Sequence, residues 1–327
     1  MKAWQLHRLG GELLFNDVRT PEPRPGSALV RIEASALMSY IKAYVEGKLP
    51  AYNPPPGPFT IGTNGVGIVE AVGRDVWHLK PGQRVVLSSH FVAAENVEDP
   101  AQVLIGLTSS PDAAPVLADW PDGTLAEYAL LPVAAVTPAE GLDHIDATQL
   151  VAIGRCIIPY GGLLRGRLAA GETVIVNGAT GAYGTAAVLV AIAMGAGRVI
   201  AAGRNAAALE AVARAGGPRV TTVVLKGDVQ TDAAALHSLR RGGRLVLMGS
   251  MTTDLPVPYT ALMLNSWEIL GQFMYPASVY RRLLDLLRSG QLDISPIRPR
   301  VYPLAALPEA MEAAADAGNL ECIVMQP

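Results

Sequence analysis

The chain has 327 residues, half of them apolar, a net charge of −3 and a sequence pI near 6.0. This length and apolar content predict two globular domains, each with its own buried core. The sequence contains no Lys/Arg-rich run suited to nucleic acid and no apolar run typical of a signal peptide or a membrane span, so we expect a cytoplasmic protein. Its two cysteines, Cys156 and Cys322, are too few and too far apart for a disulfide framework or a cysteine-rich zinc site.

The first part of the chain shows the pattern of short strands joined by turns. Alternating runs such as ALVRIEASAL are separated by turn segments such as PEPRPGS. The proline-rich segment 50–58 excludes helix and central strand, and we expect either the lip of a site or a plain surface connector there. Further strands are predicted at FTIGTNGVGIVEAVG and LKPGQRVVLSS. Together these runs favour a partly open antiparallel β-barrel.

The pattern weakens over residues 90–120, where we expect a surface excursion that ends before the strand GTLAEYALLPV. After Pro138 helical patterns replace strands, with one helix expected at 146–153 and a second at 159–168. The change of pattern indicates that a second domain begins near this point.

The most informative stretch is TVIVNGATGAYGTAAVLVAIAM, residues 173–194. A β-branched run stops at Gly178, and Gly181 and Gly184 follow at three-residue steps before a small apolar helical segment. Glycines are needed there because the backbone turns sharply, a pyrophosphate must approach main-chain N–H groups, and the helix must pack close to its strand. The alternative is a tight turn that binds nothing, but the strand that follows favours a dinucleotide site. The contacts expected in this turn are Gly178, Thr180, Gly181, Ala182 and Tyr183.

The next strand, RVIAA at 198–202, ends in Gly203, Arg204 and Asn205, and these three residues are also expected to contact the cofactor. An NAD-preferring fold places Asp or Glu at the tip of this strand to hold the ribose 2′-hydroxyl, whereas Gly203 leaves that place empty and Arg204 adds a cation. The sequence therefore predicts NADPH as the cofactor. The alternative is a solvated arginine at the start of a helix, where the helix dipole disfavours a positive charge.

Between Gly203 and Leu245 the sequence predicts one helix, one strand at 220–225 and a second helix. A six-stranded dinucleotide fold needs two strands in that interval, and each parallel crossover takes about a dozen residues, so one βα unit is expected to be missing. The strands LVLMGS and WEILGQFM complete the sheet, and the remaining helix, strand, helix and strand return to the first domain. We predict an α/β protein with a partly open β-barrel domain at 1–132 and 272–327 and a Rossmann parallel-sheet domain at 133–271.

Six segments stand in a characteristic order: GTNGVGIVEAVG, LKPGQRVV, GTLAEYALLP, GATGAYG, GGRLVLMG and YPLAALPEAMEAA. In this order the chain resembles the medium-chain dehydrogenase/reductase superfamily over essentially its whole length. Within that superfamily it is most similar to the zinc-free quinone oxidoreductase branch, which includes enone reductases. The resemblance implies a GroES-like catalytic domain and a nicotinamide-dependent oxidoreductase.

The zinc-dependent members of this superfamily hold a catalytic zinc with a cysteine, a His-Glu pair after a glycine, and a second cysteine at the domain junction. The matching positions here carry Met38, Thr63 with Asn64, and Gly154. Methionine is a poor ligand for zinc, Thr63 is not a ligand and Gly154 has no donor atom, so no catalytic metal is expected. The segment that holds a structural zinc in those relatives, about 88–115 here, has no cysteine. The quinone reductase branch usually has Asn at the Met38 position, so the substrate pocket cannot be copied across.

Without a metal, the substrate carbonyl must be activated by hydrogen-bond donors. In the zinc relatives a Ser or Thr two residues after the first cysteine binds the substrate oxygen, and the matching residue here is Tyr40, whose phenol keeps its proton at neutral pH. The alternative for Tyr40 is an aromatic ring that fills the cleft wall. Asn64 and Tyr52 are further catalytic candidates, whereas His90 is more typical of an ordinary hydrogen-bonded residue.

Further cofactor and pocket contacts are expected. Gly249 and Ser250 end a strand at the carboxyl edge of the sheet, where ligands of open α/β sheets bind, and should contact the nicotinamide ribose. The resemblance implies that Tyr183 packs against the back of the nicotinamide. Residues 273–275 are expected to wall the substrate pocket.

Three functions remain open. The leading one is NADPH-dependent reduction of a quinone or an α,β-unsaturated carbonyl, an electron-poor acceptor that takes hydride without a Lewis acid. The others are a zinc-free reductase of simple aldehydes or ketones and a redox-inactive NADPH-binding protein. A small carbonyl or quinone is therefore the expected partner, with no nucleic acid and no membrane. The apolar edge strand 267–274 favours pairing with its twin in a homodimer.

Overall fold

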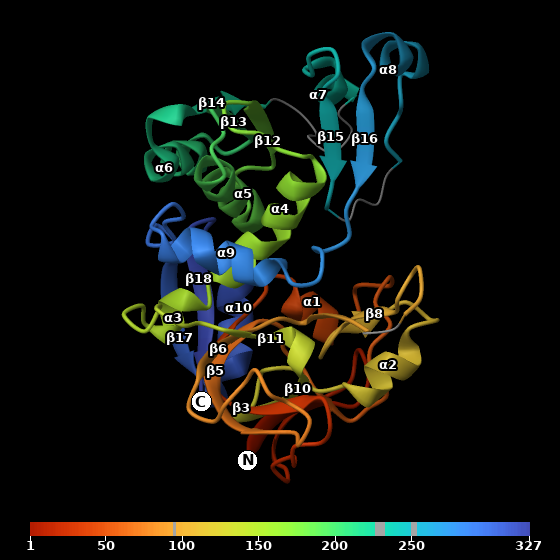
Figure 1. Ribbon diagram of the computed structural model, residues 1–327, viewed down its shortest axis with the longest axis vertical. Helices are drawn as coiled ribbons and strands as arrows, with labels where there is room; N and C mark the ends of the chain where they lie inside the picture. Colours follow the sequence, from red (N-terminus) through yellow and green to blue (C-terminus); the bar gives the residue numbers. More distant parts are fainter. Residues whose placement is uncertain (94–95, 226–232, 250–253) are drawn as a thin grey trace. The chain divides into compact units, whose positions relative to one another are not determined.

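The computed structural model describes residues 1–93, 96–225, 233–249 and 254–327 (Figure 1). The chain forms two compact units. The first unit comprises Met1–Gly154, Ile297–Ala317 and Glu321–Pro327, and the second comprises Arg155–Pro296 and Gly318–Leu320.

A seven-stranded sheet organises the first unit, with the order β11-β6-β5-β3-β18-β17 and with β10 also paired to β3. Its strands are β3 (Ser27–Ala36), β5 (Gly65–Val72), β6 (Arg84–Leu87), β10 (Tyr128–Pro132), β11 (Val136–Pro138), β17 (Arg298–Pro303) and β18 (Glu321–Gln326). Every pairing is antiparallel except that of β17 with β18. Two register shifts along β3 let this long strand curl, as β-bulges do.

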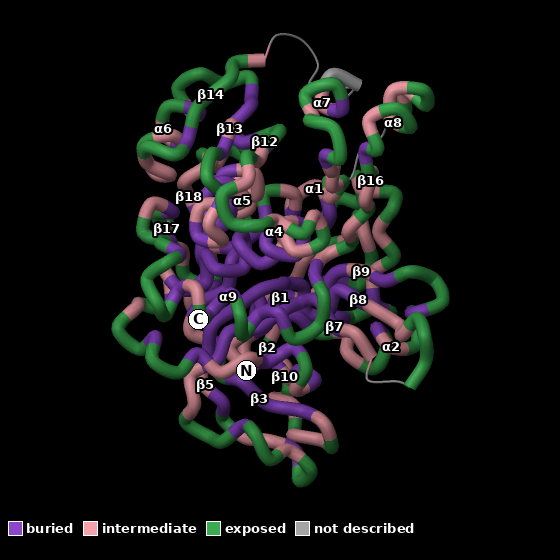
Figure 2. The backbone as a smooth tube through the Cα atoms, turned by 45° about the horizontal axis from the view of Figure 1, so that its top comes forward, coloured by how far each residue is buried: buried purple, intermediate pink, exposed green. Residues whose placement is uncertain are grey.

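The sheet curls into a partly open barrel, as predicted. Within the described part of the chain its path ends at β11 and β17, which do not pair with each other. A smaller sheet places β1 (Lys2–Leu6) between β2 (Leu13–Asp17) and β4 (Phe59–Thr60). Figure 2 shows much of β3 buried: eight of its ten residues are buried, so both faces of the strand are covered along most of its length, beyond what an alternating pattern predicts.

Residues 90–120 are more ordered than the sequence pattern indicated. β7 (His90–Val92), β8 (Gln102–Leu104) and β9 (Thr108–Ser109) form a three-stranded sheet, and α2 (Ala114–Asp119) follows. The expectation of a surface excursion was therefore wrong. These strands have two or three residues each, too few to show alternation, yet Phe91, Val103 and Leu117 join the core of the main sheet.

The two units divide the chain at Gly154 and Pro296, later in each case than the sequence suggested. β11 stays with the first unit because it pairs with β6. Helix α9 (Val279–Arg288) lies within the second unit and turns its apolar side inward. The chain returns to the first unit at its C-terminal end, where β18 pairs with β3, as predicted. The first unit also contains the helices α1 (Ile41–Val45) and α10 (Leu307–Asp316).

Parallel strands form the second unit. β12 (Thr173–Asn177), β13 (Arg198–Gly203) and β14 (Val220–Val224) make one parallel sheet, and β15 (Arg244–Leu247) and β16 (Glu268–Gly271) make another. Helices α5 (Ala182–Ala193) and α6 (Ala206–Gly216) connect the first three strands. Between β14 and β15 the described residues contain one short helix, α7 (Ala233–His237). Within the described residues the unit thus has five parallel strands, one fewer than a six-stranded dinucleotide fold, as predicted.

Helix α5 is almost uniformly apolar because it is buried on several sides. Val188 and Ala191 of α5 pack with Val176 of β12 and Val199 of β13 in the core of this unit. Helix α8 (Tyr259–Asn265) lies between β15 and β16 along the chain. This arrangement fixes α5 against the sheet, with its first turn next to the end of β12.

The first unit ends with the short helix α3 (Ala147–Leu150), and the boundary between the units falls within the next helix, α4 (Ile153–Arg165). The sequence predicted a helix beginning at Pro159, but α4 begins six residues earlier and contains Pro159. Burial explains the difference, because Ile153, Ile157 and Tyr160 recur at helical spacing and are almost fully buried. Their burial outweighs the one hydrogen bond that proline cannot make.

The continuous stretch Ala147–Arg165 has 19 residues and is apolar enough to cross a membrane by length and composition alone. Most of it, 72% of the tested window, is buried inside the protein. A core helix has the same composition and length, and the burial pattern matches a core helix.

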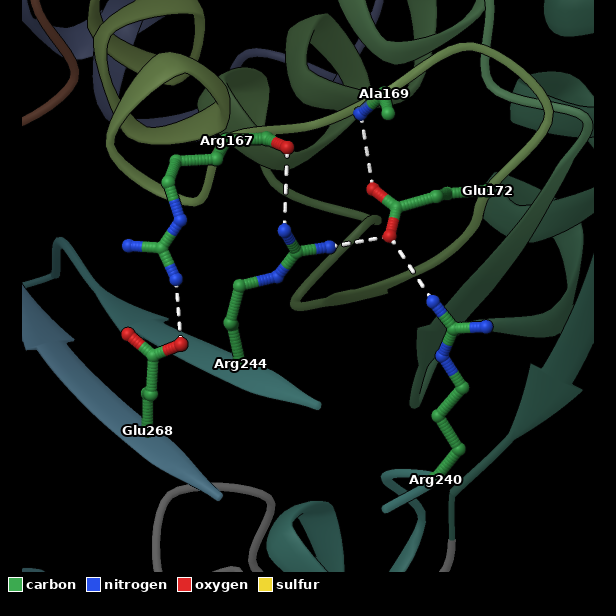
Figure 3. A network of polar contacts seen from close by, with 6 residues as sticks. All are labelled: Arg167, Ala169, Glu172, Arg240, Arg244 and Glu268. Carbon is green, nitrogen blue, oxygen red and sulfur yellow. Dashed lines mark hydrogen bonds and ion pairs between the residues drawn. The ribbon is translucent and has the colours of Figure 1, made fainter. Parts of the chain in front are cut away.

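A network of charges links the two parallel sheets of the second unit (Figure 3). The carboxylate of Glu172, just before β12, accepts from the Ala169 amide at 2.9 Å and pairs with Arg240 at 3.2 Å and with Arg244 of β15. The Arg244 guanidinium also donates to the Arg167 carbonyl at 3.2 Å. Arg167 in turn pairs with Glu268 of β16.

The pKa of Glu172 is held below its ordinary value, first by the hydrogen bond from the Ala169 amide and then by the guanidinium groups of Arg244 and Arg240, against the opposing effect of burial. Glu172→Gln should therefore lower the free energy of unfolding by about 1–3 kcal/mol at pH 7, because charge-assisted hydrogen bonds are lost. Urea unfolding followed by circular dichroism measures this change.

The effect of Glu172→Gln on the free energy of unfolding should depend on pH. A depressed folded-state pKa stabilises the protein above the unfolded pKa of about 4.3, and this contribution is lost as the pH falls through the folded pKa. The difference between wild type and Glu172→Gln should thus stay nearly constant from pH 7 down to about 5 and shrink as the pH falls below about 4. Glu210→Gln is the matched control, since Glu210 is exposed in its pair with Arg214 and contributes little. An equal effect of both substitutions would contradict the role given to the network.

Candidate functional site

The turn between β12 and α5 is built by close backbone approach. Gly178 has a φ of +72°, a conformation that favours glycine, and the Ala179 amide donates to the Ala202 carbonyl of β13 at 2.9 Å. A Cβ at Gly184 would lie 2.1 Å from the Gly178 carbonyl oxygen, so only glycine lets α5 pack this closely on the turn. These features match the requirements of a dinucleotide-binding turn.

The first turn of α5 presents main-chain donors. Gly181 is the residue before the helix, and no side chain caps the helix at this end. The amide of Thr185 donates to the Gly181 carbonyl at 2.8 Å, so the amides of Ala182, Tyr183 and Gly184 precede the first bond of the helix. Main-chain donors and the positive end of the helix dipole together suit an anion such as a pyrophosphate.

The end of β13 has no room for an acidic side chain. A Cβ at Gly203 would lie 2.7 Å from Thr180 Cγ2 and 3.0 Å from Thr180 Oγ1. The structure thus brings together two predicted cofactor residues, and Thr180 excludes Asp or Glu at position 203. Arg204 follows as an exposed residue that makes no ion pair within the described chain. The Asn205 side chain caps α6 by accepting from the Ala208 amide at 3.1 Å.

The remaining residues predicted to contact the cofactor are Tyr183, Gly249 and Ser250. Tyr183 is half-buried and lies near the buried ring of Tyr280, whose pKa is raised by burial and then by Tyr275, Cys156 and Tyr183. Gly249 is exposed just beyond the end of β15. Ser250 lies outside the described residues.

In the first unit the structure brings Tyr40 and Tyr52 together. Their ring centroids are 6.1 Å apart, and Tyr40 stands directly before α1. Burial raises the pKa of Tyr52, and a side-chain hydrogen bond with Tyr40 opposes this rise. Both residues are half-buried, so the pair forms a phenol donor group that remains within reach of solvent.

A third tyrosine supports this pair without sharing its chemistry. The Tyr44 ring lies edge-on to Tyr52 with centroids 5.6 Å apart, and its hydroxyl donates to the Leu107 carbonyl at 2.6 Å. Burial raises the pKa of Tyr44 well above its ordinary value. Tyr44 therefore positions the Tyr52 ring while its own proton stays engaged.

Asn64 lies on the turn before β5, where its carbonyl accepts from the Ala36 amide at 3.1 Å. Its side chain is 4% exposed, and its Oδ1 atom has no hydrogen-bond partner within the described chain. The hydroxyls of Thr63 and Thr124 are likewise buried without a partner there. Thr124 could not be identified from the sequence, because no pattern in GTLAEYALLPV indicates that this threonine is buried by tertiary packing.

The residues at the positions of the family's catalytic zinc do not fit a metal ion. Met38 is buried and Thr63 offers a neutral hydroxyl. A Cβ at Gly154 would lie 2.9 Å from Asn64 Cγ, so a ligating side chain at 154 would collide with the Asn64 amide. In the parts of the chain that the structure describes, no three His, Cys, Asp or Glu side chains are grouped to hold a metal.

Two weaker candidates have structural explanations. His90 is buried, its Nε2 lies 3.1 Å from Gln102 Oε1, and burial lowers its pKa. This is the ordinary hydrogen-bonded histidine that the sequence favoured. Of the expected pocket wall, Phe273 is exposed, whereas Tyr275 is buried with its ring 6.0 Å from that of Tyr280.

Comparison with known proteins adds three findings. Residues 24–141 match the alcohol dehydrogenase GroES-like domain family. An alcohol dehydrogenase of Moraxella sp. (strain TAE123) is 29% identical, over 89% of this chain and 90% of that protein. An NAD-dependent alcohol dehydrogenase of Sulfurisphaera tokodaii is 24% identical, over 100% of this chain and 99% of that protein.

The fold agrees with these relatives. The crystal structure of an NAD-dependent alcohol dehydrogenase superposes with a TM-score of 0.80 at 23% identity, and the match covers 100% of both chains. The chain is therefore similar to alcohol dehydrogenases in the matched domain and, at lower identity, along most of its length, and it shares their fold.

Proposed function

We propose that the protein is an NADPH-dependent oxidoreductase that transfers hydride to a quinone or an α,β-unsaturated carbonyl without a metal ion. The observation that carries the proposal is the glycine-built turn between β12 and α5, with an uncapped helix end behind it. Such a turn suits the pyrophosphate of a dinucleotide. When bound there, the cofactor would supply the hydride.

The preference for NADPH is supported by the end of β13. Thr180 occupies the space that an acidic side chain at position 203 would need, so the usual acceptor for a ribose 2′-hydroxyl is excluded. Arg204 is exposed beside it and suits a 2′-phosphate. One relative is named as NAD-dependent, and the end of β13 is where we expect this chain to differ from it.

Activation of the substrate carbonyl without a metal is supported by the hydrogen-bond donors in the first unit. The positions of the family's zinc ligands hold Met38, Thr63 and Gly154, which do not assemble a zinc site. The phenols of Tyr40 and Tyr52 can donate to a substrate oxygen as negative charge develops on it. An electron-poor quinone or enone needs less polarisation than a simple ketone, which favours it as the acceptor.

The names of the relatives favour a second candidate, the interconversion of an alcohol with an aldehyde or ketone. A panel of quinones, enones, aldehydes and alcohols, assayed with NADPH and NADH before and after prolonged chelation, separates the candidates. Turnover of quinones or enones that survives chelation supports the proposal. Zinc that is lost together with alcohol turnover supports a zinc-dependent alcohol dehydrogenase. Cofactor binding without any turnover indicates a redox-inactive protein.

Arg204→Ala should weaken NADPH binding by roughly ten- to a hundredfold and leave NADH binding nearly unchanged, because a charge-assisted hydrogen bond contributes about 1.5–3 kcal/mol. Fluorescence titration with both cofactors measures the two dissociation constants. Arg214→Ala, which removes an exposed arginine from α6, the helix that follows Arg204, is the matched control. Equal losses for NADPH and NADH would show a structural role for Arg204.

Tyr40→Phe should lower kcat for an enone by up to roughly a thousandfold with little change in cofactor binding, because it removes a donor aimed at the developing oxyanion. A quinone should suffer less, since its aromatising product carries the charge more easily. Tyr44→Phe is the control, because the Tyr44 hydroxyl is already engaged by Leu107. Enone turnover within a fewfold of wild type would assign Tyr40 to the cleft wall.

We also propose a homodimer that pairs the edge of the nucleotide sheet at β16, since an unpaired apolar edge favours association. Light scattering coupled to gel filtration should give twice the chain mass of 34.3 kDa. A monodisperse monomer at micromolar concentration would contradict this assembly.

A further inference from the structure

Three residues near the C-terminal end belong to the second unit although their neighbours along the chain do not. Helix α10 before them and strand β18 after them are parts of the first unit, whereas Gly318–Leu320 belong to the second. Asn319 in this segment is half-buried, and its side-chain amide donates to Thr185 Oγ1 of α5 at 3.0 Å. A residue close to the end of the chain therefore contacts the helix that follows the glycine turn.

The Thr185 hydroxyl is fully buried near the start of α5 and makes hydrogen bonds in two directions. Its oxygen accepts from Asn319, and its proton goes to the Ala179 carbonyl at 2.9 Å. Ala179 lies in the glycine turn, is itself fully buried, and donates its amide to the Ala202 carbonyl of β13 at 2.9 Å. These contacts form a continuous path from Asn319 through α5 and the turn to the end of β13.

The hydroxyl of Thr185 has a competing acceptor within its own helix. A threonine in a helix commonly bonds the carbonyl four residues earlier, here that of Gly181, and such a bond tends to bend the helix. Threonine side chains in helices divide between two rotamers for this reason. The hydrogen bond from Asn319 holds Oγ1 in the orientation that faces Ala179, so the single hydroxyl proton ties the helix to the turn.

The turn is sensitive to this tie because main-chain groups form it. Ala179 is held at its amide by β13 and at its carbonyl by Thr185. A Cβ at Gly184 would lie 2.9 Å from Ala179 Cα, so the backbone of α5 also packs against this residue. Amides at a helix end bind an anion well only when they are already aimed at it, and a supporting contact behind them supplies that order.

We propose that Asn319 is a positioning residue for the nicotinamide cofactor, which through the Thr185 hydroxyl holds the glycine turn in the shape that receives the pyrophosphate. The inference rests on the cofactor site of the proposed function. A pyrophosphate is common to NADPH and NADH, so Asn319 affects both cofactors alike, whereas Arg204 separates them.

Substitution of Asn319 gives the first test. Asn319→Ala should weaken the binding of NADPH and NADH by the same factor, roughly 2- to 12-fold, which is the effect of one hydrogen bond. The KM for the cofactor should rise by that factor, and kcat at saturating cofactor should stay unchanged. Asn265→Ala is the matched control, because it removes a side-chain amide bond of the same kind, to the Ala261 carbonyl at 2.9 Å, and should change none of these constants.

Substitution of Thr185 separates positioning from general damage. Thr185→Ser keeps the hydroxyl and should bind both cofactors as wild type does. Thr185→Val keeps the shape but removes the hydroxyl, and it should lose at least as much affinity as Asn319→Ala. Adding Asn319→Ala to Thr185→Val should cause no further loss, because the path is already broken.

Fluorescence titration with both cofactors measures these dissociation constants without turnover. Wild-type affinity in Asn319→Ala, unequal losses for the two cofactors, or additive losses in the double variant would overturn the inference and leave the proposed function intact. Equal losses in a protein that reduces no acceptor would support the inference and refute the proposed function. A wild-type protein that binds neither cofactor would refute both.

Discussion

Everything in the second unit depends on how closely one helix approaches one turn. The Gly178 carbonyl lies where a side chain on Gly184 would begin, and this contact seats α5 against the end of β12. The same approach exposes the first amides of α5 and brings Thr180 against Gly203. Backbone packing, rather than any charged side chain, thus prepares the anion-binding end of the helix and excludes an acidic residue beside it.

In the first unit the comparable constraint is the close approach of the Asn64 side chain to Gly154, which leaves no room for a Cβ at position 154. A cysteine at 154 and the present Asn64 conformation cannot coexist, since a Cβ would lie 2.9 Å from Asn64 Cγ. A cysteine at position 154 would therefore require the Asn64 side chain to move. The chain shares its fold with alcohol dehydrogenases, and a shared fold does not by itself decide the chemistry.

The sequence was informative where local backbone chemistry decides the structure. The glycine spacing from Gly178, the short interval before Leu245 and the return of β18 to the first unit could all be predicted, because turn geometry and crossover length are local constraints. Pro159 misled the prediction because burial of its neighbours overrides the rule that proline begins a helix. Two features could not be foreseen, because they arise between segments far apart in the chain: the Thr124 hydroxyl, buried without a partner in the described structure, and the Asn64–Gly154 contact. The site assignments remain predictions that the proposed substitutions test.

The charge network at Glu172 has a consequence for how the second unit opens. No strand pairing joins β12 to β15 in the described structure, and the charged link lies at the amino ends of the strands. The β15–β16 pair is therefore a separate cooperative segment, fastened by electrostatics that added salt screens. Amide hydrogens of β15 and β16 should exchange before those of β12 and β13, and the gap between the two sets should widen as ionic strength rises.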